Sequence, residues 1–287
     1  MSRRFSKMHG LGNDFVMVDA RETPLALDKA AIRALADRHL GIGFDQLLSI
    51  EPARDGESAY YYGIWNADGD PVGQCGNGVR CVAAWLHRAG AIGLDEDVQL
   101  QSPSGPVRVR LTDPLTVAVE MGEPQFDPAR IPFNAAAEAD SYALDVNGET
   151  LTIGAVSMGN PHAVTVVDML ESTRVERLGP LVTGHSRFAE GCNAGFAVLR
   201  GRDAVDLRVH ERGSGWTQAC GSGACAAMAV LRRRGLVDAR VDVHLPGGTL
   251  HIVWDGPSHA LWMTGPAAFV FEGEWPPQTS LQGSCPK

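Results

Sequence analysis

The feature that most constrains this sequence is an internal repeat. The stretch GLGNDFVMVD, which begins at Gly10, resembles SMGNPHAVTVVD, which begins at Ser157. Four aligned pairs keep a register of 145 to 147 positions (160 − 13 = 147; 220 − 75 = 145): Asn13 with Asn160, Gln46 with Asn193, Asn66 with Glu211, and Cys75 with Cys220. A register kept over half a chain indicates a duplicated domain, so we expect the fold to build one unit twice.

A proline-rich segment separates the two copies. Residues 121–140 contain Pro124, Pro128 and Pro132 and show no helical or strand period, which is typical of a connection. We therefore place the first domain at residues 1–119 and the second at residues 120–264. The next apolar stretch predicts a strand at residues 265–275 that returns to the first domain, and residues 276–287, with Cys285, are expected to form a loose tail.

Strand patterns dominate both halves. Six strands are predicted in each: residues 15–20, 47–51, 60–65, 98–102, 107–111 and 115–121, then residues 150–157, 163–168, 194–200, 204–210, 239–245 and 249–254. Helices are expected at residues 27–39, with Asp28 as N-cap, and at residues 77–90 and 222–235, which both end in glycine. The last two are rich in alanine, which suits the buried axis of a curled sheet. The predicted class is α+β: two pseudo-symmetric duplicated domains, each a curled, mostly antiparallel sheet around a central helix, with the active site in the cleft between them.

Charge and composition restrict the partners. A net charge of −9 argues against nucleic acid and anionic membrane, and no apolar run approaches the roughly 18 to 20 residues of a membrane span. The start of the chain lacks the apolar segment of a secretory signal, so we expect a cytoplasmic protein with reduced cysteines. The close cysteine pairs have the spacings C-x₅-C and C-x₄-C without matching histidines, which argues against a metal site.

Two cysteines occupy matching turns, in QCGNGVRCVAA and TQACGSGACAA. Each directly precedes a predicted helix, where free backbone N–H groups and the helix dipole favour negative charge. We therefore expect a lowered thiol pKa at Cys75 and Cys220. The residues that follow are small, so a carboxylate can dock on the N–H groups of either turn; the groups expected to hold it are Gly76, Asn77, Gly221 and Ser222.

Paired thiols suit the inversion of a carbon centre. Such a reaction removes a proton from one face of the carbon and returns a proton to the opposite face, so a thiolate and a thiol on opposite sides accomplish it in one step. The N–H groups stabilise the charge that develops on the adjacent carboxylate. No lysine lies in a context typical of pyridoxal phosphate, so the expected cofactor is none.

Six motifs follow one another in order over nearly the whole chain: MHGLGNDF, GIGFDQLL, NADGDPVGQCGNGVRC, MGNPHAV, NAGF and HERGSGWTQACGSGACAA. In this order they resemble the diaminopimelate epimerase family. The resemblance implies a homodimeric enzyme of lysine and peptidoglycan precursor biosynthesis that interconverts LL- and meso-2,6-diaminopimelate, with Cys75 and Cys220 as the acid/base pair and neither metal nor cofactor. The substrate contacts that it implies are Asn13, Gln46, Asn66, Gly76, Asn77, Asn160, Asn193, Glu211, Arg212, Gly221 and Ser222. It further implies that His162 and Glu211 tune the cysteines.

Two positions depart from the family pattern, Trp216 and Cys192. Three cysteines are predicted to be core residues: Cys81, Cys192 and Cys225. One alternative function is another isomerase of the same duplicated fold, either proline racemase-like or of the phenazine type. A second alternative is a redox-sensing or ligand-binding protein in which Cys75 and Cys220 form a switch disulfide.

Overall fold

The computed structural model describes residues 2–275, so the predicted tail at residues 276–287 and Cys285 lie outside the described part of the chain. The described chain divides into two compact units, and each is considered by itself. The first holds the residues up to Val119 together with those from Pro266 onward, and the second holds Glu120–Gly265.

The first unit is built on eight hydrogen-bonded strands in the order β17, β1, β2, β3, β4, β5, β6 and β7. Their bounds are β1 Arg3–Gly10, β2 Asn13–Asp19, β3 Gln46–Pro52, β4 Tyr60–Asn66, β5 Val98–Ser102, β6 Gly105–Asp113, β7 Thr116–Gly122 and β17 Ala268–Trp275. Neighbouring strands are antiparallel, except that β2 with β3 and β4 with β5 are parallel. The strand predicted after the second domain is therefore present as β17, on the edge beside β1.

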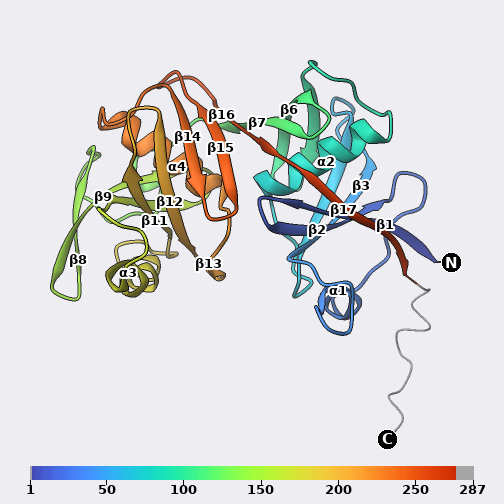
Figure 1. Ribbon diagram of the computed structural model, residues 1–287, viewed down its shortest axis with the longest axis horizontal. Helices are drawn as coiled ribbons and strands as arrows, with labels where there is room; N and C mark the ends of the chain where they lie inside the picture. Colours follow the sequence, from blue (N-terminus) through green and yellow to red (C-terminus); the bar gives the residue numbers. More distant parts are fainter. Residues whose placement is uncertain (1, 276–287) are drawn as a thin grey trace, which may run out of the picture. The chain divides into compact units, whose positions relative to one another are not determined.

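Two helices cover opposite faces of this sheet (Figure 1). The first, α1 (Lys29–Ala36), begins at Asp28, whose side chain accepts a hydrogen bond from the Ala31 N–H, and it packs in one cluster with Val16 and Val18. The second, α2 (Gly76–Arg88), is almost wholly buried and contacts β1, β2, β3 and β6, because the sheet curls around it. Successive side chains of a strand point to opposite faces of the sheet. Val16 and Val18 face α1, so their neighbour Phe15 points to the other face, toward α2.

The second unit repeats the arrangement with strands in the order β8, β9, β10, β11, β12, β14, β15 and β16. Their bounds are β8 Tyr142–Val146, β9 Glu149–Ser157, β10 Pro161–Val166, β11 Asn193–Leu199, β12 Ala204–Glu211, β14 Arg240–Leu245, β15 Gly248–Val253 and β16 Leu261–Pro266. The two-residue strand β13 (Gly215–Trp216) pairs with the end of β12. The parallel pairs are β10 with β11 and β12 with β14, at the places equivalent to those in the first unit.

Its helices are α3 (Thr173–Thr183) and α4 (Gly221–Arg233), and a short 3₁₀ turn, η1, spans Pro128–Arg130. The face of α3 with Val175, Leu178 and Val182 joins the apolar cluster on one side of the sheet. The helix α4 contacts β9, β10, β11, β12, β14 and β15 from within the curl. It lies so close to β9 that a β-carbon at Gly154 would be 2.2 Å from Val230 Cγ1, so only glycine fits there.

The strand registers confirm the duplication. Phe15 pairs with Gln46 between parallel strands, and His162 pairs with Asn193 in the same way (162 − 15 = 147; 193 − 46 = 147). The two buried helices are both 13 residues long and start 145 positions apart (221 − 76 = 145). The expected α+β class, with a curled, mostly antiparallel sheet around a central helix in each unit, is therefore confirmed.

The sequence patterns missed four larger elements. They are β1, β8, α3 and β16. The predicted helical stops are confirmed, since Gly90 and Gly235, which directly follow the C-caps of α2 and α4, both have a φ of +71°, in the left-handed region that favours glycine.

Candidate active site

Three amides of the first unit lie at strand ends. Asn13 begins β2, Gln46 begins β3 and Asn66 ends β4. Gln46 and Asn66 are direct cross-strand partners, and the Gln46 amide donates a hydrogen bond of 2.9 Å to Asn66 Oδ1. Gln46 Oε1 is buried without a hydrogen-bond partner among the described residues, which leaves an acceptor for a donor such as an ammonium group.

Cys75 is the N-cap of α2, as the sequence predicts. Its backbone is extended and its side chain makes no capping hydrogen bond to the helix. Instead, the thiol donates to Asn13 Oδ1 over 3.6 Å, and the Asn77 amide donates to the same oxygen over 3.3 Å. The first half of the predicted site, Asn13, Gln46, Asn66, Cys75, Gly76 and Asn77, is therefore assembled within one unit.

The second unit brings its predicted residues together in the same way. Asn193 begins β11, opposite the end of β12 where Glu211 lies, and Asn193 Oδ1 accepts a 2.9 Å hydrogen bond from the Arg212 N–H. His162 Nε2 lies 2.9 Å from Asn160 Oδ1. His162 is completely buried; burial, reinforced by the charge of Arg212, lowers its pKa to about 3, so the imidazole is neutral at ordinary pH.

Cys220 is the N-cap of α4, the position that Cys75 has in α2. Its sulfur accepts a 3.3 Å hydrogen bond from the Gly223 N–H and lies 3.6 Å from Ser222 Oγ. Gly223 makes this contact possible, because a β-carbon there would be 3.1 Å from the sulfur and 2.9 Å from Val209 Cγ2. The glycine therefore serves the packing of the thiol as well as the access of a ligand.

The expected lowering of the thiol pKa is wrong for Cys220. Burial raises the pKa of this thiol well above its usual range, and the nearby Glu211 carboxylate raises it further. The hydrogen bonds from Ser222 and the Gly223 N–H act in the opposite direction and do not compensate. The helix start is real, but desolvation of a fully enclosed sulfur outweighs it, so Cys220 is a thiol in this state.

Glu211 and Arg212 are held by neighbours outside the predicted site. Thr217 Oγ1 donates a hydrogen bond to Glu211 Oε1, which fixes the carboxylate on the Cys220 side of the unit. The Arg212 guanidinium donates to the carbonyl of Glu190 over 2.7 Å and remains half-exposed. Neither Thr217 nor Glu190 was identified from the sequence, although Thr217 lies within the motif that precedes Cys220.

The core assignment of the other cysteines is confirmed for Cys81, Cys192 and Cys225, which are all buried. Burial raises the pKa of both Cys81 and Cys192 to about 12. Cys81 and Cys192 are therefore protonated, and none of the three cysteines caps a helix, which distinguishes them from Cys75 and Cys220.

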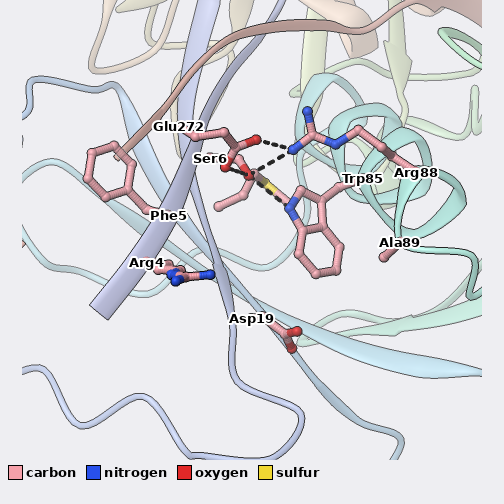
Figure 2. A pocket seen from close by; sticks show the side chains of 9 residues that line it. Arg4, Phe5, Ser6, Asp19, Trp85, Arg88, Ala89 and Glu272 are labelled. Carbon is pink, nitrogen blue, oxygen red and sulfur yellow. Dashed lines mark hydrogen bonds and ion pairs between the residues drawn. The ribbon is translucent and has the colours of Figure 1, made fainter. Parts of the chain in front are cut away.

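A separate pocket of about 330 Å³ lies on the first unit (Figure 2). None of the predicted site residues lines it. Figure 2 shows that four of its lining side chains bond to one another: the Trp85 indole N–H donates to Ser6 Oγ over 3.0 Å, and Ser6 Oγ donates to Glu272, which also pairs with Arg88. This pocket is therefore distinct from the candidate active site.

No group of three or more His, Cys, Asp or Glu side chains in residues 2–275 is arranged to hold a metal ion. No helix in the described part of the chain is both long and apolar enough to cross a membrane.

The duplicated, curled α+β sheet is a fold that this chain shares with solved structures of an epimerase, a probable racemase and an isomerase. A hydroxyproline epimerase from Agrobacterium vitis, with bound trans-4-hydroxy-L-proline, has this fold at a TM-score of 0.68 and 16% identity, over 95% of this chain and 92% of that one. A probable proline racemase from Agrobacterium radiobacter K84 (TM-score 0.68, 14% identity, 99% and 96% coverage) and a PhzF-family phenazine biosynthesis protein from Bacillus anthracis (TM-score 0.68, 16% identity, 96% and 99% coverage) share it as well.

The family follows from the sequence itself. The model of the family described as diaminopimelate epimerase matches residues 5–127 and 154–270, which cover most of both units. The chain therefore belongs to the diaminopimelate epimerase family, and this membership supports an isomerase.

Proposed function

We propose that this protein is a cofactor-independent epimerase that interconverts LL- and meso-2,6-diaminopimelate by a two-base mechanism, with Cys75 and Cys220 as the bases. The observation that carries the proposal is that both cysteines are N-caps of equivalent 13-residue helices in a duplicated fold. The family match over both units supports the choice of substrate.

The proposed reaction needs one thiolate and one thiol, which act on opposite faces of the α-carbon. The thiolate removes the α-hydrogen and the thiol delivers a proton to the other face, so each step exchanges the roles of the two groups. The carbanion forms next to a carboxylate, and N–H groups at the start of a helix stabilise that charge. Cys220, whose raised pKa keeps it protonated, is suited to be the acid. Cys75 donates a hydrogen bond to Asn13 Oδ1 in the resting protein, so it must release its proton to solvent before it acts as the base.

The polar residues around the cysteines explain why a substrate with two charged ends is proposed. Diaminopimelate carries two carboxylates and two ammonium groups. The half-exposed Arg212 guanidinium can bind a distal carboxylate in a bidentate manner, and the buried acceptor Gln46 Oε1 suits an ammonium group. Asn66 and Asn193 supply further amides without fixing a charge, and a site that bonds both ends discriminates against amino acids with one charged end.

Further features belong to the same proposal. The enzyme acts in the cytoplasm as a homodimer, in lysine and peptidoglycan precursor biosynthesis, and uses neither metal nor organic cofactor. It binds neither nucleic acid nor membrane, in keeping with the net charge of −9.

Incubation of the reduced protein with LL-diaminopimelate in D₂O tests the proposal. We expect deuterium at the α-carbon together with formation of the meso isomer. Cys75→Ser and Cys220→Ser should each abolish turnover, whereas Cys81→Ala and Cys225→Ala, which remove buried thiols from the same helices, serve as matched controls that keep it. Full-rate turnover by Cys75→Ser would refute the two-base assignment.

The principal alternative is an amino-acid racemase or isomerase of the same fold that acts on proline or a related substrate. The fold shared with a hydroxyproline epimerase and a probable proline racemase keeps this alternative open. Exchange of the α-hydrogen of proline, without exchange in diaminopimelate, would establish it. If neither substrate exchanges while Cys75 and Cys220 form a reversible disulfide, the redox-switch alternative is favoured.

A further inference from the structure

An ionic network lies behind Asn13 in the first unit. Asp45 Oδ2 accepts hydrogen bonds from the Asn13 amide over 2.9 Å and from the Asp14 N–H over 3.1 Å. The Arg38 guanidinium bridges both carboxylates, at 2.8 Å from Asp14 Oδ1 and 2.7 Å from Asp45 Oδ1. The nearly buried Lys7 ammonium lies 2.6 Å from Asp14 Oδ2. Two cations and two anions are thus linked to one amide of the candidate site.

The charge of this network is firmly held. Burial alone would raise the pKa of Asp14, but hydrogen bonds from Arg38 and Lys7 outweigh burial and keep that pKa well below its usual range. Asp14 is therefore a carboxylate at neutral pH, where its charge holds Arg38 in place against Asp45.

This network determines how the Asn13 amide is oriented. A carboxylate only accepts hydrogen bonds, so the Asn13 group that faces Asp45 must be the NH₂ end. The carbonyl end is thereby directed to Cys75, whose thiol donates to it over 3.6 Å, and to Asn77, which donates over 3.3 Å. Rotating the amide by half a turn would place its carbonyl against the Asp45 carboxylate.

The second unit has no equivalent network. Lys7 pairs with Val16 and Ala155 pairs with Ala163, the counterpart of Val16 (163 − 16 = 147), so Ala155 occupies the position of Lys7. Pro161 and Cys192 occupy the positions of Asp14 and Asp45 (161 − 14 = 147; 192 − 45 = 147). Asn160, the counterpart of Asn13, has its Oδ1 against His162 instead. The duplicated asparagines are therefore oriented by different means, and the ionic device belongs to the Cys75 half alone.

We propose that Asp45 is a positioning residue, which locks the Asn13 carbonyl toward Cys75 and so keeps the resting thiol protonated. The proposal rests on the proposed role of Cys75 in catalysis. A carbonyl oxygen that accepts from the S–H stabilises the thiol, whereas an amide N–H in the same place would stabilise the thiolate. In the native enzyme the Cys75 sulfur therefore has the same hydrogen-bonding partner, the Asn13 carbonyl, whenever substrate arrives.

Other groups near Cys75 are accounted for as follows. From β4, the buried Tyr62 interacts with Cys75, and burial raises its pKa, so it is uncharged. From α2, Cys81 is a buried thiol, and the Arg80 guanidinium donates hydrogen bonds to the carbonyls of Pro266 and Gly76. These groups are the same in every variant used below, so differences between the variants report on Asn13 and Asp45.

The test measures the pH profile of Cys75 alkylation by iodoacetamide in the full-length protein without substrate, read out by peptide mass spectrometry. The variants are Asp45→Ala, Asp45→Asn, Asn13→Ala and the double variant Asn13→Ala/Asp45→Ala. Asp97→Ala is the matched control, because it removes an exposed aspartate that pairs with Arg110 in the same unit. Continued protection of the fully buried Cys81 reports that each variant is folded.

Asp45→Ala should release the amide and accelerate Cys75 alkylation at neutral pH by about three- to tenfold, the equivalent of one ordinary hydrogen bond. Asp45→Asn keeps an acceptor for Asn13 and should stay within about twofold of the parent, as should Asp97→Ala. The double variant should react no faster than Asn13→Ala, because Asp45 acts through Asn13.

Equal acceleration by Asp45→Asn and Asp45→Ala would show that charge alone matters and would overturn the proposal. Additive effects in the double variant would overturn it as well. If Asp45→Ala exposes Cys81 and is thus unfolded, Asn13→Ala decides, since failure of that variant to accelerate alkylation excludes the Asn13 carbonyl as the controlling group. No result depends on turnover, so failure of this proposal and failure of the epimerase assignment are detected by separate measurements.

Discussion

The indole ring of Trp216 lies directly against Gly179, so that a β-carbon at residue 179 would be 2.5 Å from Trp216 Cζ2. The same ring packs on Phe196, with centroids 5.8 Å apart, and beneath the Arg208 guanidinium at 4.5 Å. Trp216, one of the two departures from the family pattern, therefore joins α3 to β11 and β12. The missing side chain at Gly179 creates the space for it.

Gly179→Ala should consequently have opposite effects in two backgrounds. In the native protein the new methyl group collides with the indole and should lower the free energy of unfolding by about 1–3 kcal/mol. In a Trp216→Leu background the collision with the indole is absent. The new β-carbon would still lie 3.1 Å from His210 Cβ, which a shift of a few tenths of an ångström relieves, so alanine should raise that free energy by up to about 1 kcal/mol, because glycine is the poorer helix former. Urea unfolding of the four proteins measures both differences, and the same sign in both backgrounds would show that the ring contact is unimportant.

The same contact explains why α3 could not be predicted. Its apolar residues Val175, Leu178 and Val182 have helical spacing, and Ser172 caps it, but Gly179 and Pro180 in its middle both disfavour a helix. Gly179 leaves room for the indole of Trp216, a residue that lies far away in the sequence. By contrast, α2 and α4 could be predicted from local signals, namely their small residues and their glycine stops.

The residues of the candidate site could be predicted from the sequence where each has a counterpart in the other copy of the repeat. The register of 145 to 147 residues identified Cys75 with Cys220 and Gln46 with Asn193, and the structure places each in an equivalent position. Features found in only one copy leave no such signal. The Asp45 network draws its charges from four separate segments, and the raised pKa of Cys220 depends on how completely the folded chain encloses the sulfur.

His162 should make the protein acid-sensitive. Folding lowers its pKa from 6.5 to about 3, chiefly because the imidazole is buried. Between pH 6.5 and pH 3 the unfolded chain therefore binds a proton at this histidine that the folded chain does not bind. The folding stability that this neutral imidazole contributes is thus present above 6.5 and is lost as the pH falls toward 3. The loss should approach about 1.4 kcal/mol per pH unit.

His162→Gln removes the titrating group and should flatten that part of the stability curve, whatever its constant cost. Chemical denaturation across the same pH interval measures the slope. His259→Gln is the matched control, because this histidine is exposed in the second unit. An unchanged slope in His162→Gln would mean that the imidazole is accessible to protons in the folded state.

Cys192 should have the reverse effect at alkaline pH. Burial raises its pKa from 9.0 to about 12, so above 9 the unfolded chain releases a proton that the folded chain retains. Its contribution to stability is present below 9 and is lost as the pH rises toward 12. Cys192→Ala should therefore reduce the alkaline slope of the unfolding free energy by up to about 1.4 kcal/mol per pH unit. Urea unfolding above pH 9 measures this, and parallel curves for the two proteins would contradict it.

Glu211 should oppose ionisation of Cys220, because its carboxylate adds to the burial that raises the thiol pKa. Glu211→Gln keeps the size of the side chain and an acceptor for Thr217, but removes the negative charge. The pKa of Cys220 should therefore fall, and the ultraviolet absorbance of the thiolate should develop at lower pH than in the native protein. The comparison of Cys220→Ala with Cys220→Ala/Glu211→Gln shows whether the change belongs to this sulfur, since those two titrations should coincide. A Glu211→Gln titration that coincides with that of the native protein would show that burial alone determines the pKa of Cys220.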